Sequence, residues 1–202
     1  MQITTSPAPV ALSWGRPFTM GRLAAAVILG SLLVAACAHV SIPLWFTPVP
    51  FTLQTFAVVF LGLVLAPGTA AAALALYLVE GMAGLPVFSV YGTGGFLHIT
   101  GLTGGYLMAY PAAGALMGIL RRRIPLSRFG AAMTAGCAGI ALILLSGAAW
   151  FEMQTHFALS TVMSLTVVPF VPGEVVKVMA AAGAAVGLSA LKRSGNSQAV
   201  RR

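Results

Sequence analysis

Two charged residues three positions apart are the first candidates for binding chemistry. Glu174 and Lys177 lie in a long apolar segment, and their spacing places both side chains on one face of a helix, where they can pair or share a ligand. Pro172 and Gly173 are typical of a helix start, whose free N–H groups carry partial positive charge. A lysine at such a terminus suits a carboxylate, and a glutamate suits an N–H donor such as a urea or an amide. A purely structural ion pair, or a lysine that extends to the membrane surface, is the alternative.

The other acidic residues are Glu80 and Glu152. Glu80 lies near the end of another apolar segment, at 68–84. An ionisable residue inside a membrane is costly, which makes Glu80 a functional candidate, although reaching the membrane surface also explains its place. Glu152 follows an aromatic pair, and we expect it in a solvated loop.

Motifs for metal, phosphate or nucleophilic chemistry are absent from the sequence. His39, His98 and His156 lack metal-ligand spacing, and we expect them at the membrane surface, with His98 also a ligand candidate because it lies in a glycine-rich stretch. The GTGG and GLTGG stretches are not followed by Lys-Ser or Lys-Thr, which excludes a P-loop. No serine lies in a GxSxG elbow. The sequence therefore predicts no metal, no cofactor and no enzyme activity.

The composition indicates what must position these residues. Of 202 residues, 59% are hydrophobic and only 7% are charged, against roughly 25% charged in a soluble domain. This excludes a soluble enzyme, a disordered chain and a nucleic-acid-binding domain, although the net charge is +8. The sequence predicts a polytopic, all-α membrane protein with one domain over residues 1–202.

Six segments approach the length of about 20 apolar residues that crosses a bilayer. We expect spans at about 20–39, 52–66, 68–84, 104–120, 130–150 and 172–191. The second and third are separated only by Pro67-Gly68, which predicts a tight turn between two helices.

The basic residues predict the orientation. Ten of the eleven Lys and Arg lie in three clusters, at 16–22, 121–128 and 192–202. With both termini in the cytoplasm, all three clusters are inside and no outer loop carries a Lys or Arg, as the positive-inside bias requires. We expect a head over 1–19, a six-helix bundle over 20–191 and a basic tail over 192–202, in the bacterial cytoplasmic (inner) membrane.

The outer loops, at 40–51, 85–103 and 151–171, are rich in glycine and proline. Irregular backbone at membrane depth must line protein or a cavity, because lipid cannot satisfy its hydrogen bonds. Since all three loops fall on one face, a ligand site open to the outside is the economical interpretation. In the first span, Ala26 and Gly30 have the spacing of small residues that lets another helix approach closely.

Four segments together resemble a known family. They are IPLWFTPVPFTLQTFAVVFLGLVLAP at 42–67, YLVEGMAGLPVF at 77–88, GLTGGYLMAYPAAGALMG at 101–118 and PFVPGEVVK at 169–177. They are similar, in order, to the BioY family, the biotin-binding S components of energy-coupling factor (ECF) transporters.

The resemblance implies a six-helix subunit that captures biotin from outside, with an acid and a lysine of the last helix on the ligand. Those positions match Glu174, where relatives usually have Asp, and Lys177. Thr103 and Tyr106 of the TGGY segment become ligand candidates, and Tyr91 or His98 could replace a loop arginine of some relatives. The implied partners are a membrane coupling subunit, with Ala26 and Gly30 as the contact, and two ATP-hydrolysing subunits.

In this interpretation the loops at 40–51 and 85–103 close over biotin. Trp45, Phe46 and Phe51 pack on its apolar rings, and Gln54, Glu174 and Lys177 meet its polar groups. Three alternatives stay open at this point: an S component for another small vitamin, a membrane enzyme using Glu80 or Glu174 as acid or base, and a structural subunit without a ligand.

Overall fold

The computed structural model describes residues 20–91 and 94–199, with side chains as far as 191. The expected head at 1–19 lies outside these residues, as do positions 200–202 of the expected tail. Residues 192–199 continue the last helix.

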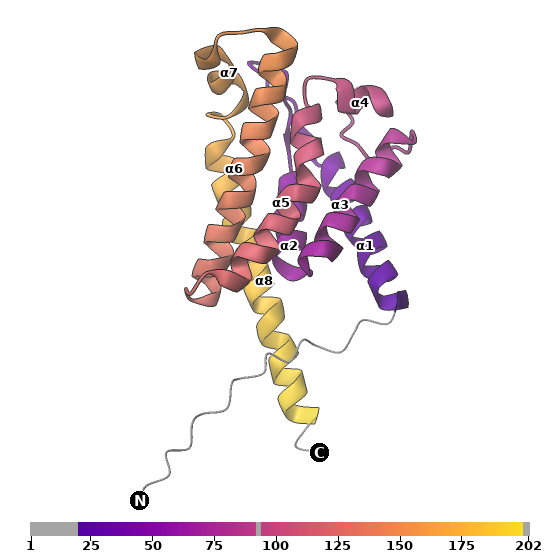
Figure 1. The fold of residues 1–202 in the computed structure, drawn as a ribbon, viewed down its shortest axis with the longest axis vertical. Helices are drawn as coiled ribbons and strands as arrows, with labels where there is room; N and C mark the ends of the chain where they lie inside the picture. Colours follow the sequence, from indigo (N-terminus) through magenta and orange to yellow (C-terminus); the bar gives the residue numbers. More distant parts are fainter. Residues whose placement is uncertain (1–19, 92–93, 200–202) are drawn as a thin grey trace, which may run out of the picture.

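Each of the six expected apolar segments forms a helix, and together these helices make the bundle of Figure 1. They are α1 (Met20–His39), α2 (Gln54–Val64), α3 (Pro67–Met82), α5 (Gly104–Arg123), α6 (Arg128–Thr155) and α8 (Val171–Ala199). Three stretches, α1, α6 and Val171–Leu191 of α8, are long and apolar enough to cross a membrane, whereas α2 is a shorter apolar helix.

Two local expectations about helix ends were wrong. Pro67 and Gly68 do not form the turn between α2 and α3, because Pro67 occupies the first turn of α3 and the turn lies at Leu65 and Ala66. A proline suits that place, since the first helical residues need no N–H donor. Glu152 is exposed as expected, but it belongs to α6, which ends only where His156 adopts a left-handed conformation.

The outer loops contain short elements that the sequence did not predict. Ser41–Ile42 (β1) and Phe51–Thr52 (β2) form a two-residue antiparallel pair in the proline-rich loop. The glycine-rich loop holds α4 (Phe96–Thr100), and the third loop holds α7 (Leu159–Thr166). Figure 1 shows α4 and α7 at the same end of the bundle, opposite the α5–α6 connection. Gly84 and Gly95 have positive φ angles of 91° and 67°, which suits glycine at these turns.

Helix α5 packs against α2, α3 and α6, and glycine makes its contact with α6 close. A Cβ on Gly105 would lie 2.2 Å from Trp150 Cβ and 2.6 Å from the Ser146 carbonyl oxygen. The Trp150 indole also donates to the Gly101 carbonyl at 2.9 Å. This contact therefore sets the position of the start of α5, which follows the glycine-rich loop.

We expect Gly105→Ala to destabilise the protein by about 1–3 kcal/mol, the usual cost of overpacking, because the new methyl group meets backbone that cannot move aside. The measurement is denaturant or thermal unfolding of the purified chain. Gly183→Ala is the matched control, since the space around Gly183 is open. Equal stability of the two variants would contradict this account of the α5–α6 contact.

Candidate ligand cavity

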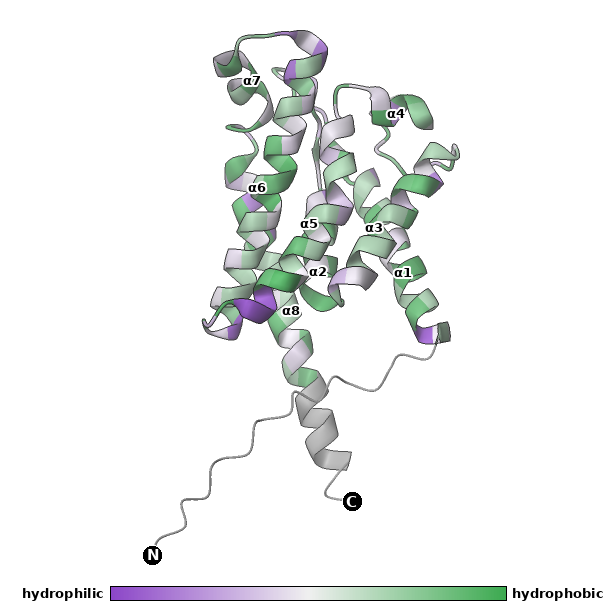
Figure 2. Ribbon diagram, in the orientation of Figure 1, coloured by the Kyte–Doolittle hydropathy of each residue, from purple (hydrophilic) through white to green (hydrophobic). Residues whose placement is uncertain are grey.

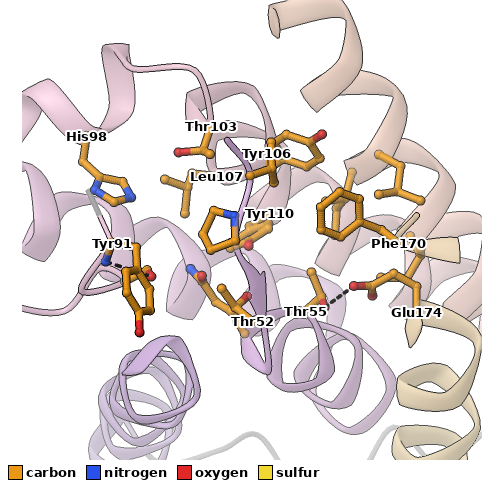
Figure 3. Close-up of a pocket in the computed structure, with 17 residues that line it drawn as sticks. Thr52, Thr55, Tyr91, His98, Thr103, Tyr106, Leu107, Tyr110, Phe170 and Glu174 are labelled. Carbon is orange, nitrogen blue, oxygen red and sulfur yellow. Dashed lines mark hydrogen bonds between the residues drawn. The ribbon is translucent and has the colours of Figure 1, made fainter. Parts of the chain in front are cut away.

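A candidate site is a cavity near the α4 and α7 end of the bundle, between the start of α2, the glycine-rich loop, α5, α6 and the start of α8 (Figure 3). It comprises about 650 Å³ of space, part of it open to solvent. Its lining combines hydroxyl, amide, imidazole and carboxylate groups with aliphatic and aromatic walls: Val49, Pro50, Thr52, Gln54, Thr55, Ser89, Tyr91, His98, Thr103, Tyr106, Leu107, Tyr110, Ile140, Ile143, Leu144, Phe170 and Glu174.

Glu174 and Lys177 form a buried ion pair, with exposed fractions of only 4% and 6%. Lys177 Nζ lies 2.7 Å from Glu174 Oε1, 2.6 Å from the Thr52 carbonyl oxygen and 3.0 Å from Thr55 Oγ1. A lysine ammonium has three N–H donors, so these partners use all of them. Lys177 thus ties α8 to β2 and α2, and it does not itself line the cavity.

The Glu174 carboxylate is satisfied on one oxygen only. Oε1 accepts hydrogen bonds from Lys177 and, at 2.9 Å, from Thr55 Oγ1. Oε2 is buried and has no hydrogen-bond partner within the part of the chain that the structure describes. Figure 3 shows the carboxylate directed toward Thr55 at the cavity wall. A buried carboxylate oxygen without a donor is unfavourable, so Oε2 is an acceptor that still needs a partner.

Phe51 supports this ion pair and is not among the residues that line the cavity. Lys177 Nζ lies 3.9 Å from the centroid of the Phe51 ring, close enough for a cation–π interaction. The same ring stacks on Phe170, with centroids 6.4 Å apart. A Cβ on Gly173 would lie 2.4 Å from the Phe51 ring, so a glycine there allows the aromatic contact.

Gln54 lines the cavity from the first turn of α2. Its Nε2 donates to Tyr77 Oη at 2.7 Å, and Tyr77 Oη donates to the Val87 carbonyl at 3.1 Å. This chain of hydrogen bonds joins α2, α3 and the glycine-rich loop. It holds the Gln54 amide in one orientation at the cavity wall.

Four expected ligand residues lie on the side of the cavity formed by the glycine-rich loop and α5: Tyr91, His98, Thr103 and Tyr106. The His98 ring stacks on Phe88 with centroids 4.8 Å apart, and Phe88 packs edge-on against Tyr77. Tyr106 Oη donates to the Thr166 carbonyl at 2.8 Å. The loop side of the cavity is therefore held by contacts with both α3 and the segment before α8.

Besides Lys177 and Phe51, three further expected site residues do not line the cavity. Trp45 is 95% exposed and packs edge-on against Phe46, which is also exposed. Glu80 accepts a hydrogen bond from the buried Ser31 hydroxyl, so it joins α3 to α1. None of the three lines the cavity.

The small residues of α1 face their own bundle. Gly30 is buried, and a Cβ there would lie 2.9 Å from Ala73 Cβ on α3. Ala26 is half-buried. At Gly30 the small residue therefore allows close packing inside this chain, between α1 and α3.

The sequence analysis missed several cavity residues, among them Thr52, Thr55 and Tyr110. Of these, only Tyr110 could have been found from sequence spacing. Tyr110 is four residues after Tyr106, which puts both on one face of α5. Thr55 directly follows Gln54, but only the meeting of α2 with α8 makes its hydroxyl a partner of Glu174.

A solved structure with a similar fold supports this architecture. It is the "Crystal structure at 2.1 A of the S-component for biotin from an ECF-type ABC transporter", with a TM-score of 0.78 and 22% sequence identity, covering 86% of this chain and 95% of that one. At this identity the match is evidence for the fold.

Sequence comparisons extend the similarity to most of the chain. It is 34% identical over 173 residues to the "Biotin transporter BioY" of Thermotoga maritima, covering 86% of this chain and 98% of the relative. It is 33% identical over 151 residues to the "Probable biotin transporter BioY" of Pyrococcus horikoshii, covering 75% and 86%. The BioY family model matches residues 11–194. The chain therefore belongs to the BioY family.

Proposed function

We propose that this protein is the substrate-capture subunit of a biotin uptake transporter and that it takes biotin from the outer face of the membrane. The observation that carries the proposal is the buried Glu174 Oε2. This atom belongs to a carboxylate that lines the cavity, and no donor among the described residues bonds to it. Relatives that cover most of the chain are named biotin transporters, which supports this ligand.

Biotin carries a ureido ring with two N–H donors. One of these N–H groups donates a hydrogen bond to Glu174 Oε2. Because the acceptor is charged, this bond is stronger than one between neutral groups. Gln54 and Thr55 lie beside Glu174 on the cavity wall and supply further polar contacts for the urea. Thr55 and Lys177 hold the other carboxylate oxygen, so the acceptor is fixed before the ligand arrives.

The rest of biotin is a sulfur-containing ring and a valerate chain, which are mainly apolar. Leu107, Ile140, Ile143 and Leu144 provide an aliphatic wall for these groups. The donors of Lys177 are all bound to protein atoms, which argues against the lysine as the partner of the valerate carboxylate. We place that carboxylate on the loop side, near Tyr91, His98 and Thr103.

The proposed membrane arrangement has six spans, with both termini in the cytoplasm of a bacterial cell. The connection of α5 to α6 carries the basic residues, and the cavity lies toward the opposite end of the bundle (Figure 2). Under the positive-inside bias this places the cavity mouth outside. Helices α2 and α3 have 11 and 16 residues, shorter than the stretch of about 20 residues that crosses a bilayer.

Release of a tightly enclosed ligand toward the inside requires energy, and this sequence has no Walker motif. We propose that a membrane coupling subunit and ATP-hydrolysing subunits supply it, as in an ECF transporter. Because Gly30 is buried, the candidate contact moves to the outward face of α1, where Ala26 is half-buried and Leu29 is exposed.

We expect Glu174→Gln to weaken biotin binding roughly 10- to 150-fold, because a hydrogen bond to a charged group contributes about 1.5–3 kcal/mol. The measurement is equilibrium binding of labelled biotin to the detergent-purified chain. Glu174→Asp keeps the charge and should retain most of the affinity. Glu152→Gln is the matched control, because it removes an exposed carboxylate outside the cavity.

A panel of other vitamins, such as thiamine and riboflavin, completes this test. Saturable one-to-one binding of biotin alone supports the proposal. Failure of the folded wild-type chain to bind biotin, or preference for another vitamin, would overturn it.

Lys177→Met should reduce the free energy of unfolding by about 3–5 kcal/mol, since it leaves a buried carboxylate unpaired. The double variant Glu174→Gln/Lys177→Met should recover most of that stability but not the affinity for biotin. Unfolding and biotin binding are measured on all three variants. If Lys177→Met weakens binding while the protein keeps wild-type stability, the lysine contacts the ligand directly and our assignment is wrong.

The orientation is tested with single cysteines in a chain whose Cys37 and Cys137 are replaced by alanine. Ser160→Cys on α7 should react with a membrane-impermeant maleimide in intact cells, whereas Leu126→Cys between α5 and α6 should react only after lysis. Both positions are exposed. The reverse pattern would invert the topology, and labelling of both positions in intact cells would rule out the six-span arrangement.

A further inference from the structure

A second cavity lies at the other end of α2 from the ligand cavity. Thr55, in the first turn of α2, lines the ligand cavity, whereas the end of α2 lines this second one. It comprises about 420 Å³, part of it open to solvent, and is lined by Leu63, Val64, Leu65, Gly118, Arg121 and Arg122. Figure 2 shows the strongly hydrophilic turn at this end of α5, directly below apolar helices.

Arg121 is held in place at this cavity by the backbone. Its Nη1 donates to the Leu63 carbonyl, one of the last carbonyls of α2, which have no partner inside their own helix. A guanidinium has five N–H donors, so this bond orients the group and leaves further donors directed elsewhere. The exposed Arg122 adds a second guanidinium to the same lining.

No acidic side chain of the sequence lies beside these arginines at this end of the bundle. Only three acids exist in the sequence. Glu174 is paired with Lys177 at the ligand cavity, and Glu80 bonds Ser31. Glu152 is 24 residues from the start of α6 at Arg128, roughly 36 Å along that helix. None of the three acidic side chains therefore supplies a counter-charge at this cavity.

We propose that this second cavity binds the phosphate of an anionic phospholipid. Guanidinium groups match phosphate oxygens in charge and geometry. Arg121 and Arg122 follow directly after the apolar part of α5, which ends at Leu120, so they lie at the level of lipid head groups. A basic pocket between membrane helices on the cytoplasmic side is a recognised type of site for anionic head groups.

The cavity walls favour a lipid over a free anion or a protein segment. Leu63, Val64 and Leu65 are aliphatic and can contact the glycerol backbone and the start of an acyl chain. The site is a recess between the ends of two helices, which suits a single head group. It lies apart from the ligand cavity, so the inference does not depend on biotin being the substrate.

The test is titration of the delipidated, detergent-purified full chain with phosphatidylglycerol, followed by native mass spectrometry. Phosphatidylcholine and inorganic phosphate are titrated in parallel. We expect one phosphatidylglycerol to be retained per chain, with much weaker retention of phosphatidylcholine. Arg122→Gln should lower the affinity for phosphatidylglycerol about fivefold, the usual contribution of one arginine near anionic lipid.

Arg123→Gln is the matched control, because it removes the same charge from the next residue of α5, which does not line the cavity. Arg121→Gln should cost at least as much as Arg122→Gln, and thermal unfolding of each variant shows whether the fold is kept. Arg122→Gln removes an exposed side chain, so it keeps the test valid if Arg121→Gln unfolds.

Equal binding of the two lipids, or equal losses in Arg122→Gln and Arg123→Gln, would overturn the proposal. Inorganic phosphate competing at the same affinity would show a free-anion site instead. If lipid binding is unchanged in Arg122→Gln but association with a co-expressed coupling subunit is lost, the cavity meets a protein, which also contradicts the lipid assignment.

Discussion

The constraint on which the ligand cavity depends is the burial of a charge pair inside an apolar bundle. Separating Glu174 or Lys177 from its partner would leave a buried charge without its counter-charge. The pair is therefore completed by atoms of β2 and α2, through the Thr52 carbonyl and the Thr55 hydroxyl. These bonds bring together segments more than a hundred residues apart, and they leave the second oxygen of the Glu174 carboxylate without a donor among the described residues.

Close helix contacts make that arrangement possible. Gly105 lets α5 approach the backbone of α6, Gly139 accommodates Met117, and Gly173 leaves room for the ring of Phe51. In a membrane the hydrophobic effect does not drive helices together, because lipid tails are also apolar. Close packing of small residues against neighbouring helices therefore contributes much of the free energy of helix association. The cavity thus persists between helices that are otherwise tightly packed, because Tyr106 and Gln54 are held by hydrogen bonds to other elements.

The two ends of the bundle differ in chemistry. At one end, irregular loops satisfy their backbone groups with each other and with side chains such as Trp150, and they surround a polar cavity. At the other end, α2 ends at Val64, and Arg121 donates a hydrogen bond to the Leu63 carbonyl, which has no partner inside that helix. The same requirement, that buried backbone groups find partners, produces a ligand cavity at one end and a basic recess at the other.

Composition, apolar segment length and motif spacing were sufficient to predict the six main helices, the family and the pairing of Glu174 with Lys177 on one helix face, since these depend on local sequence alone. Long-range contacts were not predictable in this way. Trp45 and Phe51 are both aromatic residues of one proline-rich loop, yet one is exposed and the other lies under Lys177. Gly30 packs inside its own chain, and Thr55 becomes a partner of Glu174. Only the tertiary structure decides these roles, because each depends on which distant helix lies beside the residue.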